Sequence, residues 1–346
     1  MNTLVSQETT EYYGGQYWNS FPRTIEYMSE NFTGDKNKWW LQDFKERFCG
    51  IPFEHGLIFN CGNGWVERLL IDQCIVKRVT SFDYSFNLLS EAIKEKGNRD
   101  IHYFQADVNR VDFKDDIFDL VVNVAALHHV QFINKFCLIL CRALKESGIF
   151  LNFDYIGPHR NQYSFLHWFF LKKVNRSLPK HIRKEPLLRP HLPTMIHMDA
   201  TEAIHSELII ETVQRYFNIF ERHDTAGGIA YEILTHNKKL NSVPDIELDM
   251  YIEKILLLDK TYTESKKVPP LFSYFLAKPQ KGLLEAKRKL LMFQVEEDQR
   301  EGKAKSRKWV YSNWDYAKMS FHSIYVKYMH CKAANYLRRL KHLMFR

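Results

Sequence analysis

An apolar run that breaks into two closely spaced glycines constrains this chain more than any other feature. Leu57–Phe59 forms the run, and Cys61-Gly62-Asn63-Gly64 follows it almost at once. A helical pattern of apolar residues begins at Val66 and continues through Leu69 and Leu70. A buried strand, a glycine turn and a helix in this order bring backbone N–H groups close to a nucleotide-like ligand. The pattern therefore predicts an α/β domain with a ligand site at this turn.

Apolar runs and amphipathic helical patterns alternate beyond the turn. An acid, Asp83, ends the second apolar run, where a carboxylate can bind ribose hydroxyls. Strands that alternate with helices imply a doubly wound parallel sheet. We predict strands at Val79–Phe82, Ile101–Asp107, Phe118–Val124, Gly148–Asp154, Phe217–Arg222 and Leu271–Ala277, and helices at Phe86–Glu95 and Asn134–Lys145.

Four motifs follow these predicted elements in order: Cys-Gly-Asn-Gly at 61–64, Asp83, Gln-Ala-Asp at 105–107 and Ala-Leu-His-His at 126–129. Together they resemble the class I S-adenosylmethionine-dependent methyltransferases. Further blocks resemble a bacterial branch of that family often linked to surface-polysaccharide gene clusters. These blocks are Tyr17-Trp18 with Thr33-Gly34-Asp35, Asp154-Tyr-Ile-Gly-Pro-His-Arg160 and Met198-Asp-Ala-Thr-Glu-Ala-Ile204. The resemblance covers roughly residues 12 to 280.

The resemblance implies the fold and the cofactor, S-adenosyl-L-methionine. The expected fold is a Rossmann-like seven-stranded methyltransferase sheet whose last strand is antiparallel, with a helical insertion and a basic helical C-terminal extension. Asp83 would accept hydrogen bonds from both ribose hydroxyls and Asp107 from the adenine amino group. A turn or cap role is the alternative for each acid. The predicted cofactor-binding residues are Asn60, Cys61, Gly62, Asn63, Gly64, Asp83, Tyr84, Ala106, Asp107, Val108 and Asn123.

Two positions depart from the family pattern. Asn60 stands where the family usually has its first glycine, and Ile58 stands where it commonly has an acidic or polar residue. Asn tolerates left-handed backbone conformations, so the turn is expected to form. A catalytically weak or silent binding or scaffold protein on a methyltransferase fold stays open as an alternative function.

Candidate catalytic groups follow the fourth and fifth predicted strands. His128 or His129 could remove a proton from an acceptor hydroxyl, and Asp154 could serve as base or substrate clamp. His159 and Arg160 could bind the substrate, with Arg160 holding a phosphate or carboxylate in fork geometry. A helix cap or backbone contact is the alternative for the histidines, and a surface salt bridge for Arg160.

The acceptor follows from the resemblance and not from any single residue. Polysaccharide clusters suggest O-methylation of a sugar, a nucleotide-linked sugar or a lipid-linked glycan. The aromatic residues Tyr163, Phe165, Trp168, Phe169 and Phe170 could offer such a ligand a flat face, but we expect them on the buried side of a helix. A nicotinamide oxidoreductase is a competing class. It is disfavoured because Glu67 stands where the third glycine of that fingerprint would fall.

Charge and spacing divide the chain into three parts. We predict an N-terminal helical cap at 1–50 over the cofactor cleft, a methyltransferase domain at 51–280 with an insertion at about 156–215, and an extension at 281–346. The extension holds 16 Lys and Arg against 6 Asp and Glu and carries an aromatic helical stripe. It could pack on its own domain or in a homo-oligomer, or contact an anionic membrane surface. Nucleic acid is disfavoured as a partner because no binding module accompanies the charge.

The six cysteines show no paired metal-ligand spacing, so no metal is predicted. The sequence shows no apolar leader and no long apolar run. A cytoplasmic location is therefore expected, with the inner face of the membrane as a peripheral contact.

Overall fold

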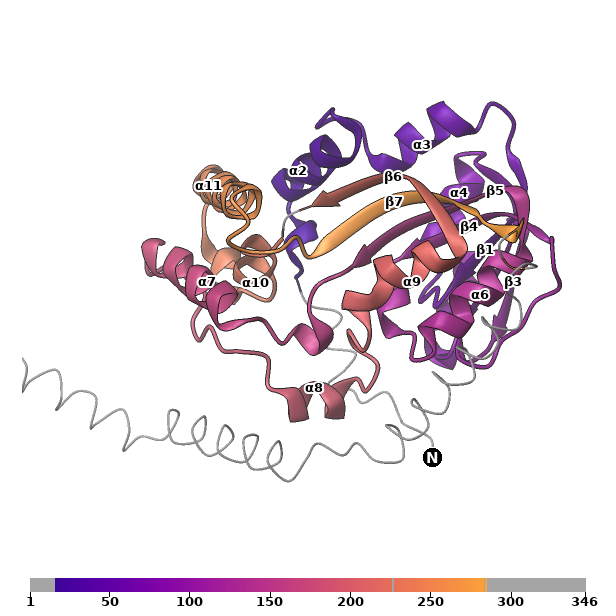
Figure 1. Ribbon diagram of the computed structural model, residues 1–346. Helices are drawn as coiled ribbons and strands as arrows, with labels where there is room; N and C mark the ends of the chain where they lie inside the picture. The colour runs from indigo at the N-terminus through magenta and orange to yellow at the C-terminus, as the bar shows by residue number, and fades with distance from the viewer. Residues whose placement is uncertain (1–15, 226, 283, 285–346) are drawn as a thin grey trace, which may run out of the picture. The chain divides into compact units, whose positions relative to one another are not determined.

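The computed structural model describes residues 16–225, 227–282 and 284 (Figure 1). The chain divides into two units between Glu296 and Glu297, and the described residues all belong to the first unit. The aromatic stripe and nearly all of the basic charge predicted for 281–346 lie outside the described residues. The packing, oligomer and membrane contacts expected for that extension therefore stay predictions.

A seven-stranded sheet with the order β3-β2-β1-β4-β5-β7-β6 forms the centre of this unit (Figure 1). Neighbouring strands from β3 to β5 pair in parallel, whereas β7 is antiparallel to both β5 and β6. This sheet confirms the Rossmann-like fold and the antiparallel last strand. The strands are β1 (Phe53–Phe59), β2 (Val76–Asp83), β3 (Ile101–Gln105), β4 (Phe118–Val124), β5 (Leu144–Tyr155), β6 (Phe217–Thr225) and β7 (Phe272–Pro279).

The predicted strands are all present, and the clearest difference in bounds is at the start of β5. The sequence predicts a helix that continues to Lys145, but α6 (Ile133–Ala143) ends at Ala143. Leu144 is already extended, fully buried and paired with Phe118 of β4. Pairing and burial of this side chain outweigh the helical pattern, so β5 begins there instead of at Gly148.

Buried side chains alternate between the two faces of the sheet. Leu57 and Phe59 of β1 belong to one buried cluster, and Ile58 between them belongs to the other. In β4, Val121 and Val122 divide in the same way. Because both faces are buried, the central strands read as continuous apolar runs, which is why they could be located in the sequence.

Two layers of helices cover these faces. The helices α6 and α9 (Ile209–Tyr216) share a cluster with Leu57 and Phe59, whereas α4 (Trp65–Asp72) and α5 (Phe86–Glu95) bury residues in the opposite cluster. Ser85 caps α5, since its side chain accepts a hydrogen bond from the Leu88 N–H. The remaining α-helices are α2 (Pro22–Thr33), α3 (Trp40–Phe48), α7 (Phe165–Ser177), α8 (Leu192–Met198), α10 (Ala230–Leu234) and α11 (Asp245–Glu264).

The N-terminal helices α2 and α3 pack against strands β5 and β7 of the sheet. Phe32 of α2 contacts Phe153 and Tyr274, and Trp40 of α3 also contacts Tyr274. Helices are therefore present in the described part of 1–50, as expected. A cover over the cofactor cleft and the domain bounds 1–50, 51–280 and 281–346 stay predictions.

The segment between β5 and β6 contains α7, α8 and α9. Of these, α9 packs on α6 and β6 and so belongs to a helix layer of the sheet. The expected burial of aromatic residues in α7 holds only in part. Tyr163 and Trp168 are buried, but Phe165 is 80% exposed and Phe169 is 51% exposed. The helix contacts α10 and buries Trp168 and Leu171, whereas these two side chains remain exposed.

Candidate functional site

The glycine turn joins β1 to α4 through three residues with left-handed backbone. Asn60 has φ 49°, Gly62 φ 57° and Gly64 φ 73°. Asn60 therefore adopts the conformation that lets the turn form without the usual first glycine. A Cβ added to Gly62 would meet nothing within 4 Å, whereas one added to Gly64 would lie 2.2 Å from the Tyr103 hydroxyl. The backbone at Gly62 thus faces open space, and the backbone at Gly64 fits closely against β3.

Asp83 at the end of β2 lies beside this turn, as the spacing of the two motifs predicts. Its Oδ2 accepts a hydrogen bond from the Gly62 N–H at 2.8 Å, and its Oδ1 accepts one from the Ser85 N–H at 2.7 Å. A carboxylate has about four acceptor positions, so each oxygen can accept a further bond from a hydroxyl group. The open backbone at Gly62 and the adjacent carboxylate fit the ribose and methionine parts of S-adenosylmethionine.

The other predicted cofactor residues surround this pair. Tyr84 is 55% exposed and Asn63 is exposed, so both side chains are accessible to a ligand. The Ala106 N–H donates to the Asp83 carbonyl at 3.0 Å, which joins the loop after β3 to the loop after β2. Cys61 and Val108 are buried in the core, so contacts with a ligand would involve their backbone.

Asp107 makes the turn contacts that were the alternative to its predicted adenine contact. Its Oδ1 accepts hydrogen bonds from the backbone and side-chain nitrogens of Asn109 at 2.9 and 3.1 Å, which is the turn role. Its Oδ2 lies 3.5 Å from the Arg110 Nε, an exposed ion pair of small energetic value. The adenine contact of Asp107 stays a prediction, and Oδ2 is the atom that could make it.

A buried polar network joins the ends of β4 and β5. Asp154 is fully buried, and its Oδ1 lies 2.5 Å from the His128 Nδ1. Its Oδ2 accepts from the Asn123 side chain and the Leu127 N–H, both at 2.7 Å. Asn123 is also fully buried. In this structure Asn123 binds Asp154, and Asp154 binds His128. The cofactor contact of Asn123 and the base or clamp role of Asp154 stay predictions.

The pKa values of the two adjacent histidines are shifted in opposite directions. Burial would lower the pKa of His128, but the Asp154 carboxylate outweighs burial and raises that pKa to about 9. Burial would likewise raise the pKa of Asp154, but the imidazolium holds it below its ordinary value. Burial, and then the charge on His128, lower the pKa of His129. At neutral pH the pair therefore consists of a charged His128 and a neutral His129.

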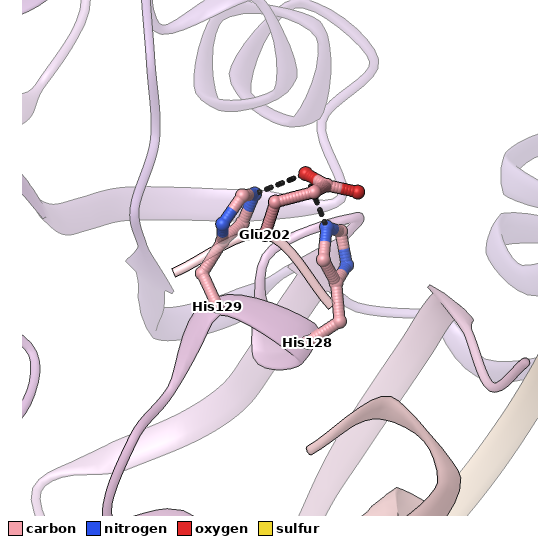
Figure 2. Close-up of side chains that lie close together, drawn as sticks. All are labelled: His128, His129 and Glu202. Atoms are coloured by element: carbon pink, nitrogen blue, oxygen red, sulfur yellow. Dashed lines mark ion pairs between the residues drawn. The ribbon is translucent and has the colours of Figure 1, made fainter. Parts of the chain in front are cut away.

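Glu202 lies over both histidine rings and comes from the segment between β5 and β6 (Figure 2). Its Oε2 is 3.8 Å from the Nε2 of His128 and 3.8 Å from the Nε2 of His129. The ring centroids of the two histidines are 4.2 Å apart. No local spacing in the sequence links Glu202 to this site. The sequence pointed to Glu202 only as part of the block at 198–204, which resembles the bacterial methyltransferase branch described above.

The predicted substrate residues His159 and Arg160 hold that block in place. The His159 Nδ1 contacts the Ile204 carbonyl at 2.6 Å. The fully buried Arg160 guanidinium donates to the carbonyls of Ala200 at 2.6 Å and Glu202 at 3.2 Å. A guanidinium committed to buried backbone carbonyls positions a segment, and it does not form the surface salt bridge that was the alternative role of Arg160. Substrate binding by these two residues stays a prediction.

Glu67 is a further buried group that sequence reasoning did not assign to the site. It lies in the first turn of α4, fully buried, and the Ser81 hydroxyl of β2 donates to its Oε1. In folds that bind a nicotinamide dinucleotide, a third glycine at this position allows the helix to pack closely on the strand. Here the long Glu67 side chain fills that space, which agrees with the sequence argument against an oxidoreductase. Burial raises the pKa of the Glu67 carboxyl to about 7.

The Glu67 carboxyl should make stability depend on pH. The raised pKa contributes stability that is fully present below pH 4.5, the ordinary pKa, and lost as pH rises through 7. From pH 5.5 to pH 8 we expect the protein to lose about 2 kcal/mol relative to a Glu67→Gln variant. Urea unfolding at the two pH values measures this. An exposed Glu91→Gln variant is the control, and parallel pH profiles for Glu67→Gln and its parent would refute the effect.

Sheet order, glycine turn and strand-end acid together define a Rossmann-like methyltransferase fold. Residues 57–152 match the family model described as "Methyltransferase domain". This segment contains the turn, Asp83, Asp107 and both histidines. The match supports the enzyme class and the S-adenosylmethionine cofactor predicted from the sequence.

Two proteins similar in sequence to this chain are also named methyltransferases. The chain is 30% identical over 126 residues to a demethylmenaquinone methyltransferase of Leptospira interrogans, which covers 35% of this chain and 49% of that protein. It is 29% identical over 99 residues to the uncharacterized methyltransferase YcgJ of Bacillus subtilis, which covers 28% of this chain and 38% of the relative. The matches thus span about half or less of these relatives.

Among solved structures, this chain is similar to an S-adenosylmethionine-dependent methyltransferase from Mesorhizobium loti. The two share 18% sequence identity over 69% of this chain and 96% of the other, with a TM-score of 0.45. Within the described part of the chain, every helix is too short or too polar to cross a membrane.

Proposed function

We propose that this protein is an S-adenosylmethionine-dependent methyltransferase that methylates a hydroxyl oxygen. The observation that carries the proposal is the pair formed by the open glycine turn and Asp83, within a segment that matches a methyltransferase domain. Gly62, Asp83 and Asp107 would hold the cofactor. When bound, its sulfonium supplies an activated methyl group.

The protein's own task is then to orient the acceptor and help its hydroxyl lose a proton. His129 is the side chain through which we expect this proton to leave, because its ring is neutral and 22% of its side chain is exposed. His128 and Asp154 form a buried pair behind it. Asn60 donates weakly to the Ala126 carbonyl at 3.4 Å, so the histidine segment adjoins the glycine turn. This contact supports acceptor and cofactor sites that adjoin at the carboxyl ends of β1 and β4.

The acceptor that we favour is a hydroxyl of a sugar, a nucleotide-linked sugar or a lipid-linked glycan. Its support is the resemblance of the sequence to methyltransferases from surface-polysaccharide gene clusters, together with the histidine pair. Phe165, Leu166 and Phe169 form exposed apolar surface on α7 that suits the lipid part of such an acceptor.

A demethylated quinone is the second candidate acceptor. It is favoured by the identity to the Leptospira demethylmenaquinone methyltransferase over 126 residues. The exposed apolar residues of α7 would suit this acceptor equally well.

Transfer of an isotopically labelled methyl group separates the two acceptors. The purified protein is incubated with labelled S-adenosylmethionine and an extract of host cells that lack the gene, and glycans, glycolipids and quinones are then analysed by mass spectrometry. We expect a labelled O-methyl group in the glycan or glycolipid fraction. Label confined to quinones would replace the favoured acceptor with the second. Absence of label from all fractions, despite cofactor binding, would support the silent binding protein.

A further inference from the structure

Three side chains with metal-binding atoms converge at the histidine pair. The candidate ligand atoms of His128, His129 and Glu202 all lie within 4.8 Å of one another (Figure 2). Both Nε2 atoms are 3.8 Å from the same carboxylate oxygen. Two imidazoles and one carboxylate are a recurrent ligand set for zinc and related ions with open coordination positions.

The hydrogen bonds behind the rings determine which nitrogens face Glu202. The His128 Nδ1–H donates to Asp154, a buried carboxylate. The Thr201 hydroxyl donates to the Asp199 Oδ1 at 2.6 Å, so its oxygen must accept from the His129 Nδ1–H at 3.1 Å. Both rings therefore direct Nε2 toward the carboxylate, and the His128 Nε2 would release its proton as an ion binds. Metal-bound histidines almost always have such a partner on the other ring nitrogen.

Three hydrogen bonds to the backbone of residues 202–204 hold this segment beside the histidine rings. The Arg160 guanidinium binds the Glu202 carbonyl, and the Arg160 N–H donates to the Ala203 carbonyl at 2.8 Å. The Ile204 N–H donates to the His128 carbonyl at 3.1 Å, which ties the segment directly to the histidines. Ala203 has φ 49°, a conformation that alanine adopts only when its surroundings impose it. The backbone that carries the Glu202 side chain is thus fixed beside the histidines.

We propose that His128, His129 and Glu202 bind one divalent transition-metal ion of the Zn²⁺ class. Bonds of about 2.0–2.1 Å in a tetrahedral site would bring the ligand atoms to roughly 3.3 Å apart. The carboxylate oxygen now lies 3.8 Å from each Nε2, and all the candidate ligand atoms lie within 4.8 Å of one another, so binding needs a contraction of the site. Mg²⁺ is excluded as the natural occupant because it prefers oxygen ligands. The prediction of no metal relied on local spacing, which could not bring Glu202 to the histidines.

The chemical role of the ion rests on the proposed function. An acceptor hydroxyl in the open coordination position would release its proton to water more readily, as zinc-bound water does. His129 would then assist as a ligand of the ion. Metal binding itself can be measured without acceptor or cofactor, so failure of this inference and failure of the proposed function are distinguishable.

Titration of metal-free protein with Zn²⁺ tests the site. The full chain, without a polyhistidine tag, is stripped with a chelator and titrated by calorimetry, and bound zinc is counted by mass spectrometry. We expect one strongly bound ion per chain and no comparable binding of Mg²⁺. The variants Glu202→Gln and His129→Ala should lose this ion. Asp154→Asn, which alters the partner of a ligand, should weaken binding by about 10–100-fold.

A matched control comes from an exposed histidine–carboxylate pair. The His181 Nε2 lies 2.8 Å from the Glu247 Oε1, far from the proposed site in the sequence, and His181→Ala should keep the strong ion. Equal zinc affinity and stoichiometry in the parent, Glu202→Gln and His129→Ala would overturn the proposal. If these variants fail to fold, the absorption spectrum of Co²⁺ added to the metal-free parent chain tests the proposal instead. Absorption typical of four- or five-coordinate cobalt supports the site, and the spectrum of hexa-aqua cobalt overturns it.

Discussion

Replacing Asp83 with alanine is expected to weaken S-adenosylmethionine binding by roughly 10- to 150-fold. Hydrogen bonds to a charged group contribute about 1.5–3 kcal/mol, and Asp83 is the carboxylate placed to accept from ribose hydroxyls. The structure adds a second cause, because the same side chain binds the N–H groups of Gly62 and Ser85. Calorimetric titration of parent and variant measures the difference.

Two controls show whether weaker binding in Asp83→Ala comes from a lost contact with the ligand or from a destabilised glycine turn. Asp83→Asn keeps the size of the side chain, and thermal unfolding without ligand reports whether the turn itself is destabilised. Asp115→Ala removes an exposed acid that pairs with Arg142 and should leave cofactor affinity unchanged. Equal affinity in Asp83→Ala and the parent would remove Asp83 from the cofactor site.

Replacing His129 with alanine is expected to lower methyl transfer by about 10²–10⁴-fold, the usual contribution of a group that assists proton transfer. Cofactor affinity should stay nearly the same, because His129 follows β4 and not the glycine turn. The rate of label transfer to the acceptor fraction measures the first quantity, and calorimetry the second. His181→Ala is the control. Unaltered transfer by the alanine variants of His128, His129, Asp154 and His159 would show that none of them assists.

The strands and the approach of Asp83 to the glycine turn could be predicted because their signals are local. A buried parallel strand appears as an apolar run, and a glycine turn followed by a strand-end acid has a characteristic spacing. The structure accordingly brings Asp83 to Gly62. The end of α6 could not be predicted in this way, because pairing of Leu144 with Phe118 depends on a strand elsewhere in the chain.

The acceptor side depends on contacts between distant segments, so the sequence could point to candidate residues but not to the contacts among them. His128 and Asp154 were alternative bases in the sequence, and the structure makes them one buried pair. The sequence suggested an anion ligand or a surface salt bridge for Arg160, and the structure shows its guanidinium bound to backbone carbonyls inside the protein. Glu202 had no assigned role at all. Its approach to the histidines follows from the path of the long segment between β5 and β6.

The central claim is that the glycine turn and Asp83 form a site for S-adenosylmethionine. Calorimetric titration of the purified chain with S-adenosylmethionine, and separately with a nicotinamide dinucleotide, tests it most directly. We expect saturable binding of one S-adenosylmethionine per chain, weakened in Asp83→Ala, and no binding of the dinucleotide. Binding of the dinucleotide alone, or binding of neither ligand by folded protein, would contradict it.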